Sequence, residues 1–552
     1  TGHGRVPPTY DLRWNPPADG NPVDHYIVYQ SASPIPDDDV SGATATTVGG
    51  DTLSLAITLT PDTGLQHFRV SAVTLDGVEH ALSPEYRVDT TARVAFLADR
   101  TLDERFELYT VSATGGDVTR VSGPLFGEAT VRAYAWSPDA TRIAYLADPQ
   151  SAGVVELFVA PADGSAPAVR VSGPIVHFAD VVDFAWSPDG RHLAFIADRR
   201  ADDIFELYVT SPDGNRLPQR VSPPAVIRDE RPSGVRQFAW SPDCTRLAFT
   251  SDHRQQGLYE LYVTRVGSTL RQRVSGTLIP RGDDFEGVSD FAWSPDGTRL
   301  AYLANQNYAG MVEVFVVSAE GGTPRAIGGP FVPGGNVSAF AWSPDSTRVA
   351  FVADKSIDEL HALWVADANG SDPVNVSGQI TSNGDVDPFI AWARDGSRIV
   401  FRGDIEIDDL VALYSVDPAG GDRRRISGAL LASSTVEAFA ISPDSTRAAY
   451  LGTSGVTDSV ELKTATLDGS VNFTVTPFLP FGANVFGFDW SPQGEALAYV
   501  ADQLLVGKTE LFRTDPATPG GESLRLSGAI RSDADVQDAR WSPLSWDDTL
   551  GR

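Results

Sequence analysis

The chain has 552 residues, of which 73 are acidic and 43 basic, so its formal net charge is −30. This acidity disfavours nucleic-acid binding, because phosphates need basic groups to neutralise them. A single cysteine, Cys244, excludes an intrachain disulfide, and no apolar run approaches the roughly 20 residues needed to insert into a membrane.

The first ninety residues differ in pattern from the rest of the chain. Leu12 and Trp14 in LRWNPP, Tyr26 and Tyr29 in VDHYIVY, and the segment LTPDTGLQHFRVSAV (59–73) resemble a fibronectin type III module. The resemblance implies a seven-strand, immunoglobulin-like β-sandwich over residues 1–90. Such modules mostly act as spacers or binding units.

From residue 93 onward the chain repeats one phrase, as in FAWSPDGTRLAYLAN (291–305). Its anchor is a Trp, replaced once by Ile, and successive anchors are 49 to 54 residues apart. The anchors are Trp136, Trp186, Trp240, Trp293, Trp342, Trp392, Ile441, Trp490 and Trp541. A period near 50 residues is typical of stacked supersecondary units.

Each period predicts four short strands. In the copy that starts at Phe184, FAW and HLAFIAD are apolar runs joined by SPDG, which has Pro at the second turn position and a Gly that tolerates positive φ. ELYVT and QRVS follow as the third and fourth strands. Four antiparallel strands make a propeller blade, and we expect the anchor Trp to pack against the next blade.

The two ends of the repeat region predict how the ring closes. Residues from Arg93 supply a second, third and fourth strand without a first, whereas QDARWSP (537–543) supplies a first strand alone. Together they would make one composite blade and leave no free sheet edge. We therefore expect an all-β chain with a nine-bladed propeller over 91–545 and a C-terminal tail over 546–552, although propellers usually have about four to eight blades.

The phrases WSPDGTRLAY, ELYV and RVSG resemble the repeats of TolB-like β-propellers over about residues 93–543. This resemblance implies a protein-binding or substrate-gating module located outside the cytoplasm, in the periplasm, at the cell surface or secreted. A shared fold does not by itself carry an activity.

Acidic residues concentrate in the loops between the second and third strands. From the Asp-like position that ends the second strand to the Glu-like position in the third, the nine windows hold 24 acidic and seven basic residues. In a propeller these loops and those that enter the next first strand lie on one face. We therefore expect a strongly negative top face and a nearly neutral bottom face.

The repeated Asp and Glu have a structural and a metal-binding interpretation. The structural one, which we favour, has each Asp capping loop amides and each Glu pairing across strands with the Arg of RVSG, as in Glu107 with Arg120. The alternative is calcium, which prefers several oxygen ligands. Its best candidates are the acidic loops Asp283 to Glu286, with Asp284 between them, and Asp533 to Asp538. No other cofactor is expected.

The sequence contains no GxSxG or HExxH motif and no repeated His partner, so we expect no catalytic residues and no enzyme activity. The mouth of the axial channel is the general binding site of a propeller. We expect binding residues at the top face and at this mouth. They are Asp183, Gln237, Asp283, Asp284, Glu286, Asp290 and Asp538.

These observations favour a non-enzymatic, extracytoplasmic binding or scaffold protein. Its expected partner is a basic protein or peptide, and the chain itself is expected to be a monomer. Two alternatives stay open: an accessory or substrate-gating module of a hydrolase, and a calcium-stabilised surface or adhesion component.

Overall fold

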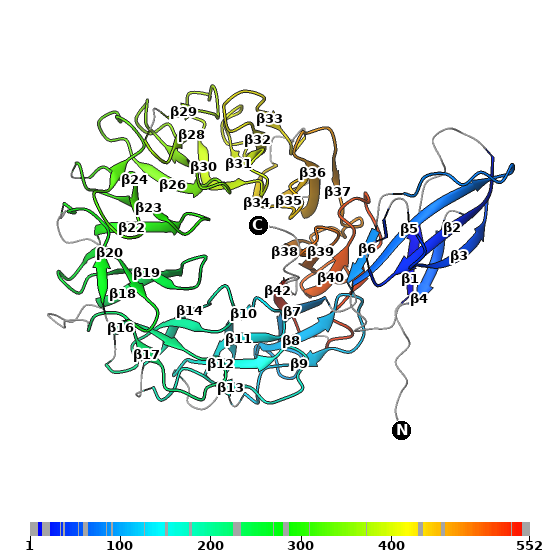
Figure 1. Cartoon of the computed structure of the whole chain (residues 1–552), viewed down its shortest axis with the longest axis horizontal. Coiled ribbons are helices and arrows are strands. Elements are labelled where there is room, and N and C mark those ends of the chain that lie inside the picture. The colour runs from blue at the N-terminus through cyan, green and yellow to red at the C-terminus, as the bar shows by residue number, and fades with distance from the viewer. Residues whose placement is uncertain are drawn as a thin grey trace.

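The computed structural model contains strands throughout and no helix in the residues it describes. Those residues are 9–13, 22–33, 35–36, 39–52, 54–58, 65–83, 86–89, 92–125, 127, 129–148, 153–175, 179–201, 203–224, 233–268, 270–279, 286–308, 310–370, 373–428, 434–453, 459–531 and 533–543. The all-β class expected from the sequence is confirmed. Figure 1 shows most of the sheets arranged around a common axis, with the first six strands set to one side.

The described residues of the N-terminal part form six strands. They are β1 (Thr9–Arg13), β2 (Val23–Ser31), β3 (Thr44–Gly49), β4 (Ser54–Thr58), β5 (Leu65–Thr74) and β6 (Tyr86–Asp89). β1 pairs with β4, and the other four form a sheet in the order β3-β2-β5-β6. Tyr26, Val28, Phe68 and Ala72 are buried on β2 and β5, so these two strands provide its core.

The repeat region forms four-stranded antiparallel units, in which the strands follow one another from the axis outward. Its first half contains β7 (Arg93–Ala98), β8 (Glu107–Ser112), β9 (Thr119–Arg120), β10 (Val131–Trp136), β11 (Arg142–Ala147), β12 (Glu156–Pro161), β13 (Val169–Arg170), β14 (Val181–Trp186), β15 (Leu193–Ala197), β16 (Ile204–Thr210), β17 (Gln219–Arg220), β18 (Ser233–Trp240), β19 (Arg246–Ser251), β20 (Leu258–Arg265), β21 (Arg271–Arg273), β22 (Glu286–Trp293), β23 (Arg299–Ala304), β24 (Glu313–Ser318) and β25 (Arg325–Ala326).

The second half continues the same pattern to the last described strand. It contains β26 (Val337–Trp342), β27 (Arg348–Ala353), β28 (Ala362–Asp367), β29 (Val374–Asn375), β30 (Val386–Trp392), β31 (Ile399–Gly403), β32 (Ala412–Val416), β33 (Arg424–Arg425), β34 (Val436–Ile441), β35 (Arg447–Thr453), β36 (Val460–Thr466), β37 (Asn472–Thr474), β38 (Val485–Trp490), β39 (Leu497–Ala501), β40 (Glu510–Thr514), β41 (Leu524–Arg525) and β42 (Val536–Trp541).

The turn between the first two strands of a unit has the geometry that the sequence predicts. In the unit β14–β17 the Gly190 amide donates to the Ser187 carbonyl at 2.8 Å, and Gly190 has a φ of +67°. A left-handed residue at this position is strain-free only for Gly. Each second strand is almost wholly buried, as β15 illustrates, because it is covered on both faces by neighbouring sheets.

The last described strand pairs with a strand more than 400 residues earlier in the chain. β42 runs antiparallel to β7, with Val536 opposite Ala98 and Trp541 opposite Val94, so the sheet order there is β42-β7-β8-β9. The Arg93 amide adds a hydrogen bond to the Ser542 hydroxyl at 3.0 Å. Elsewhere, two short parallel pairings join three units, β14 to β25, into one twelve-stranded sheet.

The anchor Trp side chains join neighbouring sheets, but in the opposite direction to the one expected. Each indole Nε1 donates to a carbonyl of the preceding sheet, as Trp186 does to Ala135 at 3.1 Å. The expectation that Trp packs against the next blade was therefore wrong, because each Trp ring lies against the preceding sheet. The same bond, 3.0 to 3.2 Å long, is made by Trp136, Trp240, Trp293, Trp342, Trp392, Trp490 and Trp541.

Candidate binding surface on the inner strands and loops

Four of the expected binding residues occupy one equivalent position on the innermost strands. Asp183 on β14, Gln237 on β18, Asp290 on β22 and Asp538 on β42 each follow a β-bulge. They lie opposite Ile196, Thr250, Leu303 and Leu97, respectively. A bulge re-aims the side chains around it, and bulges are frequent next to functional sites.

The fold places three of these residues on consecutive units and separates the fourth. Asp183, Gln237 and Asp290 belong to successive units, and the Gln237 amide nitrogen donates to the Ser289 carbonyl of the next unit at 3.4 Å. Between Asp183 and Asp538 stands the unit β10–β13, which has Ala133 at the equivalent position. The acidic residues expected around the mouth of the channel are therefore not continuous, because Ala133 lies between Asp538 and Asp183.

Partial removal from water raises the pKa of both Asp183 and Asp290 above the ordinary value of an aspartate, although both residues remain exposed. The Asp290 carboxylate accepts the amide of Phe291 at 2.8 Å, which favours the charged form but does not outweigh the burial. Asp538 differs, because it forms an ion pair with Arg540 at 3.6 Å. The inner strands thus carry carboxylates that a cationic ligand would stabilise.

The sequence reasoning missed a polar cluster where β38, β42 and β10 meet. Asp489 lies next to Trp541, whose backbone amide donates to its carboxylate at 2.9 Å. Burial raises the pKa of Asp489, with Asp538 adding to the effect and Arg540 opposing it. Burial also raises the pKa of Tyr134, whose hydroxyl donates to the Ala95 carbonyl at 3.1 Å. The sequence did indicate a difference here, because the phrase that ends at Trp490 reads FDW in place of FAW.

A second missed carboxylate lies on β30, where the chain contains an extra stretch before its anchor. Asp387 pairs with Arg402 at 2.7 Å, and the Arg402 guanidinium lies 4.3 Å from the centroid of the exposed Phe389 ring. Burial raises the pKa of Asp387 despite the arginine. The irregular register between Val386 and Ile390 creates this arrangement.

The Asp that ends each second strand has the structural role that the sequence favoured. One Asp198 carboxylate oxygen accepts the Asp180 amide at 2.5 Å and the other accepts the Asp203 amide at 3.1 Å. A single buried side chain therefore fixes two loops. Asp99, Asp252, Asp354, Asp404 and Asp502 each accept amides from two loops in the same way.

The predicted Glu–Arg pairs are also present. Glu206 is 4% exposed and pairs with Arg220 at 2.6 Å, while the Tyr208 hydroxyl donates to its other oxygen at 2.6 Å. Equivalent pairs join Glu107 to Arg120, Glu156 to Arg170, Glu260 to Arg273 and Glu510 to Arg525. Because these carboxylates already bond other residues of the fold, they are poor candidates for metal ligands.

One unit replaces its missing glutamate with a residue from a loop. β32 has Ala412 at the glutamate position, and Arg425 pairs instead with Glu406 at 3.2 Å. Glu406 lies in the preceding loop, between β31 and β32. The loop carboxylate therefore substitutes for the strand carboxylate.

The remaining expected residues are not placed by the structure. Asp283 and Asp284 lie outside the described residues, and so does the side chain of Glu286, the first residue of β22. Within the described part, no three or more His, Cys, Asp or Glu residues lie close enough together to hold a metal ion. The same part has no helix long and apolar enough to cross a bilayer.

An exposed apolar patch lies beside the acidic loops and was not predicted. Phe478 and Phe481 are 90% and 85% exposed, and Leu504, Leu505 and Val506 are about half exposed or more. Gly482 lies against Val506, which brings the two loops together. A grouped apolar surface of this kind is typical of interaction sites. The segments PFLPF and QLLV carried the signal.

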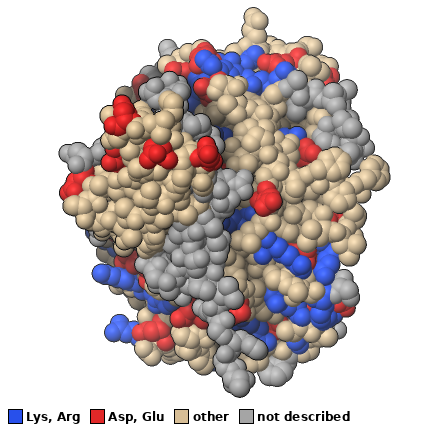
Figure 2. Space-filling view, turned by 90° about the vertical axis from the view of Figure 1, so that its right-hand side faces the viewer, with Lys and Arg blue, Asp and Glu red and all other residues tan. Residues whose placement is uncertain are grey.

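Charge on the side that carries the N-terminal strands is mixed. Figure 2 shows acidic and basic side chains there in small separate groups, with basic groups prominent at the upper and lower margins. Among the residues described on this side, neither sign forms a continuous surface.

Comparison with known proteins agrees with this architecture. Residues 217–413 match the family model of the lipoprotein LpqB β-propeller domain. The chain folds as a β-propeller. No curated protein sequence matches the chain.

Solved structures resemble the chain in fold at low sequence identity. A crystal structure of the eukaryotic initiation factor is 12% identical and has a TM-score of 0.51, over 82% of this chain and 98% of that one. The dipeptidyl peptidase 4 of Porphyromonas gingivalis is 14% identical with a TM-score of 0.46, over 72% and 62% of the chains. The propeller domain of the Trilobed protease from Pyrococcus furiosus is 12% identical with a TM-score of 0.36, over 65% and 98%.

Proposed function

We propose that the chain is a non-enzymatic, extracytoplasmic binding or scaffold protein that engages a basic protein or peptide. The observation that carries this proposal is the set of carboxylates on the inner strands, Asp183, Asp290, Asp387 and Asp489, whose pKa values are raised by burial. Such groups gain from a nearby cation, because it offsets the cost of holding a negative charge that is partly removed from water.

The proposal includes a finer architecture. We take the repeat units to form one closed ring of nine blades, completed where β42 joins β7, β8 and β9, and the first six strands to be a fibronectin type III-like spacer. The β42–β7 pairing supports the closure, since it leaves neither strand with a free edge on that side. The protein would work as a monomer without a cofactor.

Two further observations support binding rather than catalysis. Repeated carboxylates of the loops and third strands, such as Asp198 and Glu206, are already bonded within the fold. The apolar patch around Phe478 and Phe481 offers contact area next to these loops.

The partial match to a lipoprotein propeller domain supports a location outside the cytoplasm.

The experiment uses a fluorescein-labelled, arginine-rich peptide and measures its binding by fluorescence anisotropy at 50 and 300 mM salt. We expect binding that weakens with salt, because surface electrostatics are screened. Replacing Asp183 and Asp290 together by Asn should weaken binding by about tenfold at the lower salt. The control variant replaces Asp163 and Asp213 by Asn. Both are exposed aspartates in turns between a third and a fourth strand, so the control makes the same charge change at a different place.

The control pair should leave binding within about twofold of the unmodified protein. Binding that does not depend on salt, or equal losses in both variants, would show that the inner carboxylates are not the site.

A further inference from the structure

We call the contact between two neighbouring sheets a seam. The seam between the sheets that begin with β30 and β34 is the one where the anchor residue is not Trp. At the neighbouring seam the Trp392 indole donates to the Ala341 carbonyl at 3.2 Å. Ile441 stands at the equivalent position of β34 and has no N–H to donate from its side chain. It is half-buried, as are Trp136 and Trp392, whereas Trp186, Trp240, Trp293, Trp342 and Trp490 are buried.

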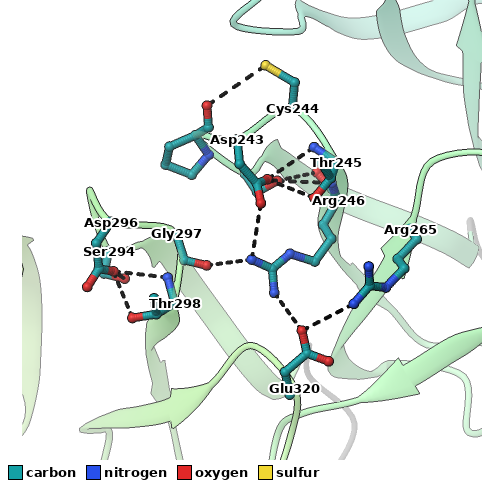
Figure 3. Close-up of polar contacts among 12 residues, drawn as sticks. Asp243, Cys244, Thr245, Arg246, Arg265, Ser294, Asp296, Gly297, Thr298 and Glu320 are labelled. Carbon is teal, nitrogen blue, oxygen red and sulfur yellow. Dashed lines mark hydrogen bonds and ion pairs between the residues drawn. The ribbon is translucent and has the colours of Figure 1, made fainter. Parts of the chain in front are cut away.

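An intact seam shows what normally surrounds the indole. The Arg246 guanidinium lies 5.2 Å from the centroid of the Trp293 ring, and its Nη2 donates to the Gly297 carbonyl at 2.8 Å. Figure 3 shows this arginine reaching across to the turn of the next sheet and to Glu320. Arg142 and Arg299 repeat both contacts over Trp186 and Trp342, at 5.2 and 5.3 Å from the ring centroids.

The altered seam has the same arginine in a different arrangement. Arg398 is the equivalent residue, and its Nη1 contacts Asp422 Oδ2 at 3.1 Å while its Nη2 contacts the Leu467 carbonyl at 3.4 Å. The arginines of intact seams bond the fourth residue of the next turn, whose equivalent here is Ser445. Arg398 is thus turned toward the third-to-fourth-strand turns.

Leu467 is larger than its counterparts, which include Ala368 and Val266. Its amide donates to the Thr446 carbonyl at 3.0 Å, as the Ala368 amide does to Thr347 at 2.8 Å, so the two positions are equivalent. Leu467 is 4% exposed and packs in the same cluster as Ile441. The Leu467 side chain is therefore part of the packing at this seam.

Beside Leu467 the structure has an open pocket of about 450 Å³. Leu467, Arg398, Asp422 and Asp468 line it, together with Ser and Thr hydroxyls of the surrounding turns. Its volume lies in the range of about 300 to 1,000 Å³ that is usual for small-molecule sites. Leu467 is the apolar residue of this lining, Arg398 supplies a planar cation, and the other lining residues are carboxylates and hydroxyls.

We propose that this pocket binds a planar aromatic group with an N–H donor, of the indole class. The ring would lie against the Arg398 guanidinium, as the protein's own indoles lie against Arg142, Arg246 and Arg299. The N–H would donate to a carboxylate or carbonyl of the lining. The site is formed by the first-to-second and third-to-fourth turns, so it lies at the opposite end of the strands from the acidic loops of the proposed function.

Binding is tested with indole and with N-acetyl-tryptophan amide by saturation-transfer NMR and titration calorimetry. Indole represents a free aromatic metabolite, and N-acetyl-tryptophan amide represents the Trp side chain of a peptide. The probe that binds with the lower Kd shows which of these two sources the site prefers. Cyclohexylmethanol serves as the non-planar apolar probe. We expect both indoles to bind and this probe not to bind.

The matched variant is Ile441→Trp combined with Leu467→Ala, which restores the pattern of the intact seams. It should abolish indole binding and raise the melting temperature, because the protein then supplies its own ring. The control Leu270→Trp adds a Trp at a position that is 81% exposed and should change neither binding nor melting. Arg398→Met removes the stacking cation and should weaken binding about two- to fivefold.

Failure of the unmodified protein to bind either indole would overturn the proposal, as would binding that survives in the double variant. If circular dichroism shows that the double variant is unfolded, Arg398→Met decides, and unchanged affinity in that variant overturns the stacking geometry. Equal binding of cyclohexylmethanol would reject an aromatic site.

Discussion

At the scale of single residues, the inner strands hold carboxylates under conditions that favour their neutral form. Asp489 accepts a backbone amide from Trp541 and lies beside Asp538 and Arg540, yet burial still raises its pKa. A group whose folded pKa exceeds its unfolded value binds protons more readily when folded. Its contribution to stability is present at low pH and is lost as the pH rises through the folded pKa.

We therefore expect Asp489→Asn to stabilise the protein at pH 7.5, because the amide carries no charge and its oxygen can still accept the Trp541 amide. The gain should shrink as the pH falls toward 4, where the native carboxyl becomes protonated. Thermal melts of both proteins across this range measure the effect. A difference that is constant with pH would contradict the burial explanation.

Turn residues show a limit of reasoning from residue type. The turn position that is Gly190 or Gly297 in some units is Cys244, Ala140 or Ser346 in others, and all of these have φ between +57° and +68°. The hairpin register imposes the left-handed conformation on whichever residue is there. Cys244 is therefore a turn residue in the same conformation as its counterparts.

At the scale of elements, the third strand of a unit is fixed by a buried ion pair. Glu206 on β16 bonds both the Arg220 guanidinium and the Tyr208 hydroxyl, so both of its oxygens are satisfied. Removing one partner of a buried pair is costly, since the other charge stays buried without compensation. Equivalent pairs in four other units imply that this connection is part of how each sheet is built.

Glu206→Ala should lower the free energy of unfolding by about 3 kcal/mol. The control is Glu320→Ala, whose carboxylate pairs with Arg246 and Arg265 but is 68% exposed, and which should cost less than about 1 kcal/mol. Urea unfolding followed by Trp fluorescence measures both. Similar losses in the two variants would mean that burial does not set the strength of these pairs.

At the scale of the whole molecule, the two ends of the repeat region meet in one sheet. β42 pairs with β7, and Trp541 bonds Asp489 of the preceding unit through both its indole and its backbone amide. The terminal strand therefore contacts two units that lie on either side of it. In the proposed nine-bladed ring, this strand is the closing element.

A chain that ends at residue 535 lacks β42 and should lose at least about 3 kcal/mol of stability, since the buried Trp541 and the β7 pairing are both removed. A chain that ends at residue 543 keeps β42 and should match the full chain. Urea midpoints of the two truncated forms give the comparison. Equal midpoints would show that β42 does not close the propeller.

The sequence by itself determined the repeating unit: its strands, its Ser-Pro-Asp turn, the Asp that caps two loops and the Glu–Arg pair. These features depend on hydrogen bonds whose partners recur at fixed short spacings, so the pattern of residues is enough to specify them. Tertiary structure alone decided which way the Trp rings lean, that Asp489 lies near Asp538 and Tyr134, that Glu406 substitutes for a strand glutamate, and that a pocket opens beside Arg398 and Leu467. Those contacts cross the seams between sheets, and their geometry depends on how one packed surface is set against the next, which no local spacing encodes.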